Sequence, residues 1–179
     1  MEKEKLILGF SKSTKKIKIL SDIIMWADES DYSHVYLRRE SKYGEYVYQA
    51  SGLAVNFTGI DIFLSHNQPV HEIVLYIDPG QKAKLLEFFI SHAGVPYGVD
   101  QLLKLSQVLI CKKLGIKYDT SKMLNGNNKF ICSELGLVVV RDILGYDITL
   151  EESSDLVTPR DLYEAINYYL KIQADGTKD

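Results

Sequence analysis

The sequence has 179 residues, of which 46% are hydrophobic and 25% charged, the balance of an ordinary globular protein. This length predicts one domain over residues 1–179, and the composition excludes disordered and collagen-like chains. With 21 Lys and Arg against 24 Asp and Glu, the formal net charge is −3, which gives no electrostatic reason to expect a nucleic-acid partner.

The first half of the chain carries the predicted strands. Strand-like apolar runs, separated by polar or glycine-containing turns, occur over residues 5–10, 33–39, 45–50, 53–58 and 70–77. The second and third runs flank Gly44 and are expected to form a hairpin. Between the first two runs, apolar residues recur at helical spacing over 14–27, with Ser13 as the N-cap of the expected helix.

Helices dominate the second half. Helical periodicity predicts helices over residues 81–91, 99–114, 130–144 and 162–170, although the Val-Val-Val run of the third also permits a strand. Thr158 and Pro159 are typical of a helix start, residues 125–128 form a turn cluster, and a polar tail is expected over 172–179. This order predicts an α+β fold with a mainly antiparallel sheet packed against helices.

Nothing in the sequence predicts export or a membrane anchor. No apolar run approaches the roughly 18 residues that span a bilayer, and the two glutamates at the start of MEKEKLILGFSKS do not fit a signal peptide. Only two cysteines are present, which is typical of a reducing compartment. We therefore expect a cytoplasmic protein without an integral membrane segment.

Cys132 is the candidate nucleophile. It follows a turn-rich loop and lies at the start of the helix expected over 130–144, where free amide groups and the helix dipole favour a thiolate. A buried, unreactive cysteine is the alternative interpretation. Cys111 fits that alternative, because it lies in the middle of a helix with no candidate catalytic residue nearby in sequence.

Four histidines are available as a base for this thiolate. His34 lies on an expected strand, and Gln49, near the end of the paired strand, can orient the imidazole through its side-chain carbonyl oxygen. His66, His71 and His92 would allow a zinc site, but no cysteine pair and no His-Glu-x-x-His spacing supports one. His92 also fits a helix end, where the dipole favours positive charge.

Three short motifs occur one after another along the chain. They are Tyr32-Ser33-His34-Val35, Cys132-Ser133-Glu134-Leu135 and Thr158-Pro159-Arg160-Asp161-Leu162. With this order and these separations, the chain from about residue 9 to residue 165 resembles the circularly permuted papain-like group of the NlpC-type cysteine hydrolases, and within it the YiiX/YaeF-like amidases. The resemblance implies a permuted papain-like (NlpC-like) fold in which the histidine strand precedes the cysteine helix.

The resemblance also implies roles for individual residues. Cys132 matches the nucleophile, His34 the general base and then acid, and Gln49 the polar residue that orients His34, a position where members often carry an acidic residue. Tyr97, in a Tyr-x-x-Asp match, is expected to line the cleft or assist the oxyanion site, and Ser133 to contact substrate. The aspartate of that match, at position 100, fits a helix-start charge equally well.

The expected function is a thiol hydrolase, either an amidase or peptidase or an esterase, that acts through a thioester intermediate without metal or organic cofactor. Its substrate would be a small-molecule, peptide or lipid-like acyl compound. Three alternatives stay open: a lipid acyltransferase of the same permuted fold, a non-catalytic binding or assembly module whose 12 tyrosines mark a contact surface, and a metal-binding regulator. The oligomeric state is left open.

Overall fold

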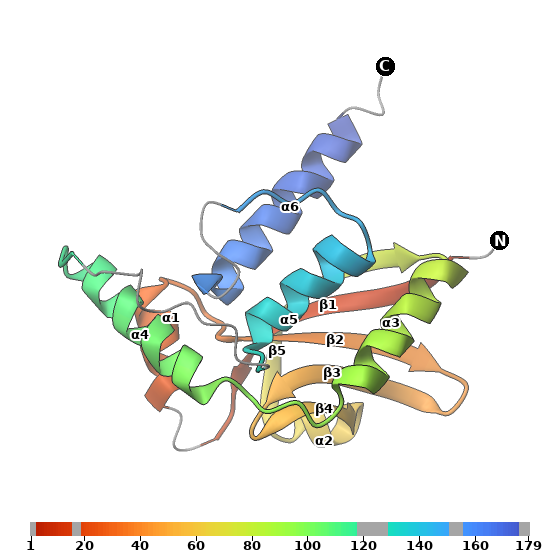
Figure 1. Ribbon diagram of the computed structural model, residues 1–179, viewed down its shortest axis with the longest axis horizontal. Helices are drawn as coiled ribbons and strands as arrows, with labels where there is room; N and C mark the ends of the chain where they lie inside the picture. Colours follow the sequence, from red (N-terminus) through yellow and green to blue (C-terminus); the bar gives the residue numbers. More distant parts are fainter. Residues whose placement is uncertain (1–2, 16–18, 118–128, 151–155, 176–179) are drawn as a thin grey trace.

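The computed structural model describes residues 3–15, 19–117, 129–150 and 156–175 (Figure 1). Within these residues, a five-stranded antiparallel sheet has the strand order β4-β3-β2-β1-β5. The strands are β1 (Glu4–Ser13), β2 (His34–Ser41), β3 (Gly44–Ser51), β4 (Ala54–Gly59) and β5 (Asn67–Ile77). The expected α+β class with an antiparallel sheet is therefore confirmed.

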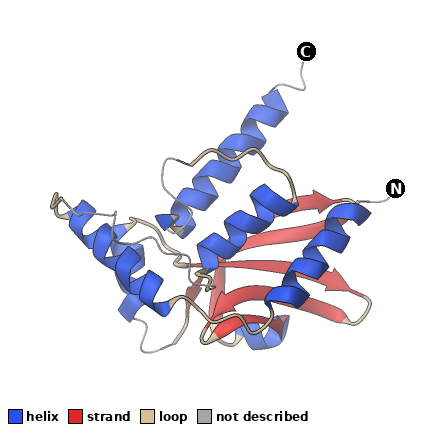
Figure 2. Cartoon of the chain, in the orientation of Figure 1, coloured by secondary structure: helices blue, strands red, loops and turns tan. Residues whose placement is uncertain are grey.

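The helices pack on both faces and at one end of this sheet (Figure 2). They are α1 (Ile19–Ala27), α2 (Ile60–Leu64), α3 (Pro79–His92), α4 (Val99–Lys113), α5 (Cys132–Val138), which continues as a π-helical turn (η2, Val139–Ile143), and α6 (Pro159–Asp175). Helices α3, α5 and α6 share one core with the sheet, whereas α1 and α4 pack against each other. No described helix has the length and apolarity needed to cross a bilayer.

The two faces of the sheet bury different clusters because side chains alternate along each strand. On β2, Val35 and Leu37 point into the main core beneath α3, α5 and α6. Tyr36, between them, points to the other face and packs with Phe63 of α2, the two ring centroids lying 4.4 Å apart. Each fully buried aliphatic or aromatic side chain contributes about 1.5–3 kcal/mol of transfer free energy. Strand β2 is thus held from both sides.

Gly136 brings α5 close to β2. A Cβ atom at this position would lie 2.9 Å from both Val35 Cγ1 and Leu162 Cδ2, closer than such atoms pack in proteins. The absent side chain therefore lets α5 approach both the strand and α6. Since Cys132 begins α5, the same close packing fixes the cysteine against the start of β2.

Several predicted boundaries are wrong. Strand β1 runs through Ser13, which pairs with Asn67 of β5, so Ser13 ends a strand and caps no helix. Helix α1 begins at Ile19 and not at residue 14, while residues 16–18 lie outside the described part of the chain. The apolar pattern alone did not predict the end of β1, because pairing with β5 extends the strand beyond its apolar run.

The other differences concern short or terminal elements. Helix α2 was not predicted, because its five residues are too few to show helical periodicity. Helix α6 starts at Pro159 as expected but continues to Asp175, since no glycine or proline interrupts it before Gly176. The tail expected from residue 172 is therefore helical as far as 175. The turn cluster at 125–128 and residues 176–179 lie outside the described residues.

Asp28, directly after α1, gives a testable effect of pH on stability. Burial raises the pKa of its carboxyl from 3.8 to about 6, and the negative charge of Asp161 raises it further. Hydrogen bonds from Thr158 and Arg160 lower this pKa but do not offset the rise. Because the folded state holds the proton more tightly than the unfolded state, ionisation costs stability as the pH rises from about 4 through 6. We expect Asp28→Asn to stabilise the fold at pH 7.5 by about 1 kcal/mol, a figure reduced for partial solvent exposure.

Thermal unfolding at pH 7.5 and pH 4 measures this effect. The melting temperature of the Asp28→Asn variant should exceed that of the parent at pH 7.5, and the difference should be much smaller at pH 4, where the carboxyl of the folded protein is protonated. Asp31→Asn, at a neighbouring exposed position, is the matched control and should change little at either pH. A lower melting temperature for Asp28→Asn at pH 7.5 would contradict the interpretation.

Candidate active site

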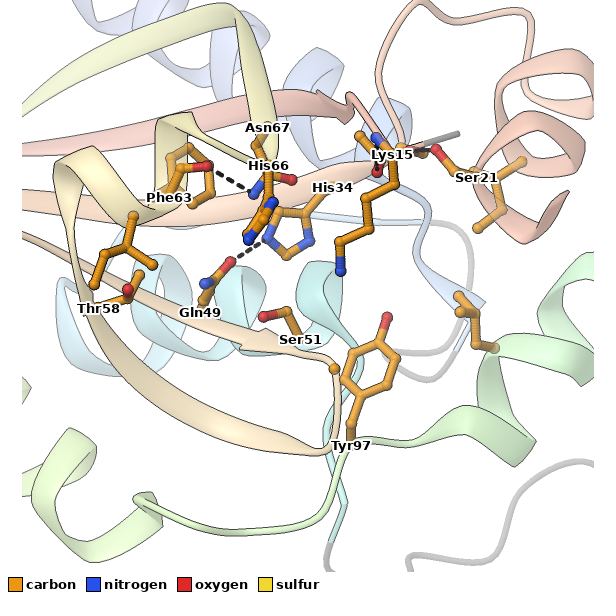
Figure 3. A pocket seen from close by; sticks show the side chains of 16 residues that line it. Lys15, Ser21, His34, Gln49, Ser51, Thr58, Phe63, His66, Asn67 and Tyr97 are labelled. Atoms are coloured by element: carbon orange, nitrogen blue, oxygen red, sulfur yellow. Dashed lines mark hydrogen bonds between the residues drawn. The ribbon is translucent and has the colours of Figure 1, made fainter. Parts of the chain in front are cut away.

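The candidate site lies where β2 and β3 separate. The two strands pair from Ser41↔Gly44 to Leu37↔Tyr48, and His34 and Gln49 lie beyond the last pair. His34 is held instead by pairing with Ser11 of β1. Across the opening, His34 Nε2 and Gln49 Oε1 lie 2.8 Å apart in a hydrogen bond (Figure 3). The predicted pairing of these two side chains is therefore present.

Asn56, which sequence reasoning missed, sets the orientation of the Gln49 amide. It lies opposite Gln49 in the β3–β4 register, and its Nδ2 donates to the backbone oxygen of Ala54 at 3.0 Å. The Asn56 oxygen therefore faces Gln49 and accepts from Gln49 Nε2 at 3.4 Å, which leaves Gln49 Oε1 for His34. Since an amide oxygen only accepts, His34 Nε2 carries a proton, and Nδ1 is the ring nitrogen left for another partner.

Cys132, the first residue of α5, lies beside this imidazole. The His34 imidazole and the backbone N–H groups of Val35 and Ser133 lie close enough to the Cys132 sulfur to lower the pKa of its thiol. The sulfur also lies 3.9 Å from the carbonyl oxygen of Ser33. Residues 98 positions apart in the sequence thus meet at the start of β2.

Electrostatics at this pair favour charge separation. Burial raises the pKa of the Cys132 thiol, but the hydrogen bond and positive charge of His34, with the two backbone donors, outweigh it, so that the pKa falls below its ordinary value. Burial likewise lowers the pKa of His34, yet the bonds to Cys132 and Gln49 raise it overall. Both shifts stabilise a thiolate beside an imidazolium, the reactive form of a cysteine nucleophile.

Tyr97 lies next to the sulfur, as well as lining the adjacent pocket as expected. The loop that precedes α4 positions Tyr97. Tyr97 forms an isolated β-bridge with Phe130, and the N–H of the next residue, Gly98, donates to the Phe130 backbone oxygen at 3.0 Å. Burial, the Cys132 charge and a hydrogen bond with Cys132 raise the pKa of the Tyr97 phenol well above 10. The phenol therefore stays protonated at neutral pH and can donate to a neighbouring anion.

Two other residues of the predicted site have structural roles. The Ser133 hydroxyl is buried, donates to the Val157 backbone oxygen at 2.6 Å and does not line the pocket, so the predicted contact of Ser133 with substrate stays a prediction that this side chain does not support. Only its backbone N–H faces the sulfur. Asp100, in the first turn of α4, pairs with Lys129 at 3.0 Å, in keeping with a helix-start charge.

A pocket of about 270 Å³ opens beside these residues (Figure 3). Its wall includes Ser33, His34, Gln49 and Tyr97, three of which contact the Cys132 sulfur. Cys132 itself is 3% exposed and lies directly behind that wall. The His34 and Tyr97 side chains are only half-buried, so a bound molecule would contact them first.

The other histidines lie in separate environments. His66 lines the pocket, His71 stacks on Tyr163 with ring centroids 4.8 Å apart, and His92 ends α3, where its Nδ1 lies 2.7 Å from the Phe88 oxygen. Among the described residues, no group of three His, Cys, Asp or Glu side chains is close enough to hold a metal ion. A zinc site formed by these three histidines is therefore not supported.

No family model matches the chain, and a search of curated proteins finds no match to it. The resemblance to permuted papain-like hydrolases therefore remains a prediction from three short motifs. The arrangement of Cys132, His34, Gln49 and Tyr97 is the evidence on which a function can be argued.

Proposed function

We propose that this chain is a thiol hydrolase of the permuted papain-like kind, which cleaves an amide or ester through a thioester on Cys132. One observation carries the proposal: the His34 imidazole lies beside the Cys132 sulfur and is hydrogen-bonded to the Gln49 amide at the wall of a pocket. Nucleophile, base and orienting group in this sequence are the components of a cysteine hydrolase site. A structural cysteine needs neither a paired imidazole nor a lowered thiol pKa.

The proposed reaction has two steps. The Cys132 thiolate attacks the carbonyl carbon, the tetrahedral intermediate collapses, and the His34 imidazolium gives its proton to the leaving amine or alcohol. This leaves an acyl thioester and a neutral imidazole. His34 then removes a proton from water, the hydroxide attacks the thioester, and the carboxylic acid departs as the sulfur regains its thiolate form beside the imidazolium.

Two donors are available for the negative oxygen of the tetrahedral intermediate. The backbone N–H of Cys132 lies in the first turn of α5, where amide groups have no partner within the helix. The Tyr97 phenol is the second, since it stays protonated at neutral pH and lies next to the sulfur.

Direct detection of the acyl-enzyme tests this proposal. The protein is mixed with p-nitrophenyl esters and amino-acid anilides of increasing chain length, quenched in acid and analysed by intact and peptide mass spectrometry. An adduct with the mass of the acyl group on the Cys132 peptide is expected. An adduct on Cys111 alone, or no adduct across the series, would contradict the proposal.

The same experiment separates hydrolysis from acyl transfer. Release of the free acid shows that water is the acceptor. Addition of a lysophospholipid or a simple alcohol would instead yield the acylated acceptor if the chain is an acyltransferase, which is the alternative kept from the sequence.

Gln49 gives a prediction about pH dependence. Gln49→Glu keeps the hydrogen bond and adds a negative charge, so it should raise the pKa of His34 further and move the alkaline limb of kcat/KM to higher pH. Gln49→Ala removes the bond and should lower kcat roughly tenfold or more, because the imidazole loses its orientation. Rate profiles from pH 5 to 10 measure both effects, and an unchanged profile in both variants would exclude Gln49 as the orienting residue.

A further inference from the structure

The pocket beside Cys132 has a positive side. Lys15 and His66 line it together with His34, and none of its described lining residues carries a carboxylate. The whole chain has a formal net charge of −3, so this local excess of basic groups is opposite in sign to the molecule. Figure 3 shows the Lys15 side chain extending into the pocket toward Tyr97.

The backbone holds Lys15 and His66 together. Lys15 follows the end of β1, and the preceding Thr14 N–H donates to the His66 oxygen at 2.9 Å, which ties the two segments. The Lys15 N–H bonds the Ser13 hydroxyl at 3.2 Å. Lys15 has no carboxylate partner among the described residues, whereas other lysines such as Lys82 and Lys129 form ion pairs. Its charge is therefore available to a ligand.

The rest of the pocket is small and mixes apolar with polar side chains. Ile24 of α1, Leu102 of α4 and Phe63 of α2 line it together with several hydroxyl and amide groups. Its volume of about 270 Å³ lies just below the roughly 300–1,000 Å³ of pockets for drug-sized ligands. A short acyl chain with a polar end fits such a space better than an extended polypeptide does.

We propose that this pocket selects acyl substrates that carry an anionic group, a carboxylate or a phosphate, held by Lys15 and His66 while the carbonyl reaches Cys132. The inference rests on the proposed function, because it names the substrate class of the same site. Lys15 supplies a full charge, and His66 and the lining hydroxyl and amide groups add hydrogen-bond donors. A neutral acyl group of equal size would leave the Lys15 ammonium without a partner.

Binding is tested without turnover. The Cys132→Ala protein is titrated calorimetrically with glutarate, with inorganic phosphate and with the neutral analogue glutaramide. At least one anion should bind at least tenfold more tightly than glutaramide, and the stronger of the two identifies the anionic group. Lys15→Ala should remove this preference, whereas Lys12→Ala, on β1 outside the pocket lining, should keep it. Equal affinity for anions and glutaramide, or equal loss in both lysine variants, would overturn the inference.

Turnover tests the same preference in the active protein. If carboxylate is the preferred anion, kcat/KM for mono-p-nitrophenyl glutarate should be at least tenfold higher than kcat/KM for p-nitrophenyl valerate. In Lys15→Ala, the ratio of these two values should approach one. A p-nitrophenyl ester whose acyl chain ends in a phosphate group replaces the glutarate ester if phosphate binds better. Lysine-dependent anion binding without hydrolysis of any ester would support the pocket inference and refute the hydrolase. Ester hydrolysis with no preference for anionic substrates would support the hydrolase and refute the pocket inference.

Discussion

Replacing Cys132 with alanine is expected to abolish both turnover and labelling by a thiol-directed electrophile, with a loss of about 10³-fold or more in kcat/KM. The reason is that, in the proposed mechanism, the sulfur forms the covalent bond to the acyl group, and the His34 imidazole lowers the pKa of this thiol. Cys132→Ser keeps the size of the side chain but replaces the thiolate by a hydroxyl that His34 ionises poorly, so it should be almost as inactive.

Cys111→Ala is the matched control for this experiment. Cys111 is half-buried on α4 and outside the pocket lining, so its removal should leave turnover intact. Circular dichroism and thermal melting of each variant confirm that the fold persists. Full labelling of Cys132→Ala with loss of labelling in Cys111→Ala would assign the reactive thiol to Cys111 and refute the proposed site.

His34→Ala is expected to lower kcat/KM by about 10²–10⁴-fold, the range of general acid–base catalysis. Two effects combine: the Cys132 thiolate loses its positive partner, and the leaving group loses its proton donor. The pKa of the Cys132 thiol should rise toward the value of an unpaired buried thiol, because burial then acts without the opposing imidazole.

Rescue by imidazole separates this role from a structural one. Free imidazole at millimolar concentration should restore part of the activity of His34→Ala, since the deletion leaves space beside the pocket for a small base. His92→Ala, at a histidine that packs on Phe88 outside the pocket lining, is the control and should retain the parent rate. A His34→Ala protein with parent activity would show that another group activates the sulfur.

The sheet and most helices could be predicted from local pattern. The alternating residues of β2 and β3 predicted a hairpin, and the hairpin brings His34 and Gln49 to one end of the sheet. The helix that begins with Cys132 was also predicted, since its apolar run continues through the π-helical turn that ends at Ile143. These features depend on residues close together in sequence.

The features that were missed depend on contacts between distant segments. β1 extends to Ser13 because β5 pairs with it, and this extension carries Lys15 to the pocket. Asn56 lies in the strand expected over residues 53–58, but its role follows only from the β3–β4 register, which places it opposite Gln49. The Ser133 hydroxyl turned away from the pocket because the Val157 oxygen, 24 positions later, accepts its hydrogen bond.

The pH dependence of Cys132 alkylation tests the thiolate–imidazolium pair most directly. In the Cys111→Ala protein, Cys132 is the only thiol, so the rate of reaction with iodoacetamide between pH 4 and 10 reports its ionisation. The alkylation rate should be half-maximal below the ordinary thiol value of about 8.5. A single rise centred at or above 8.5, unchanged in His34→Ala, would contradict it.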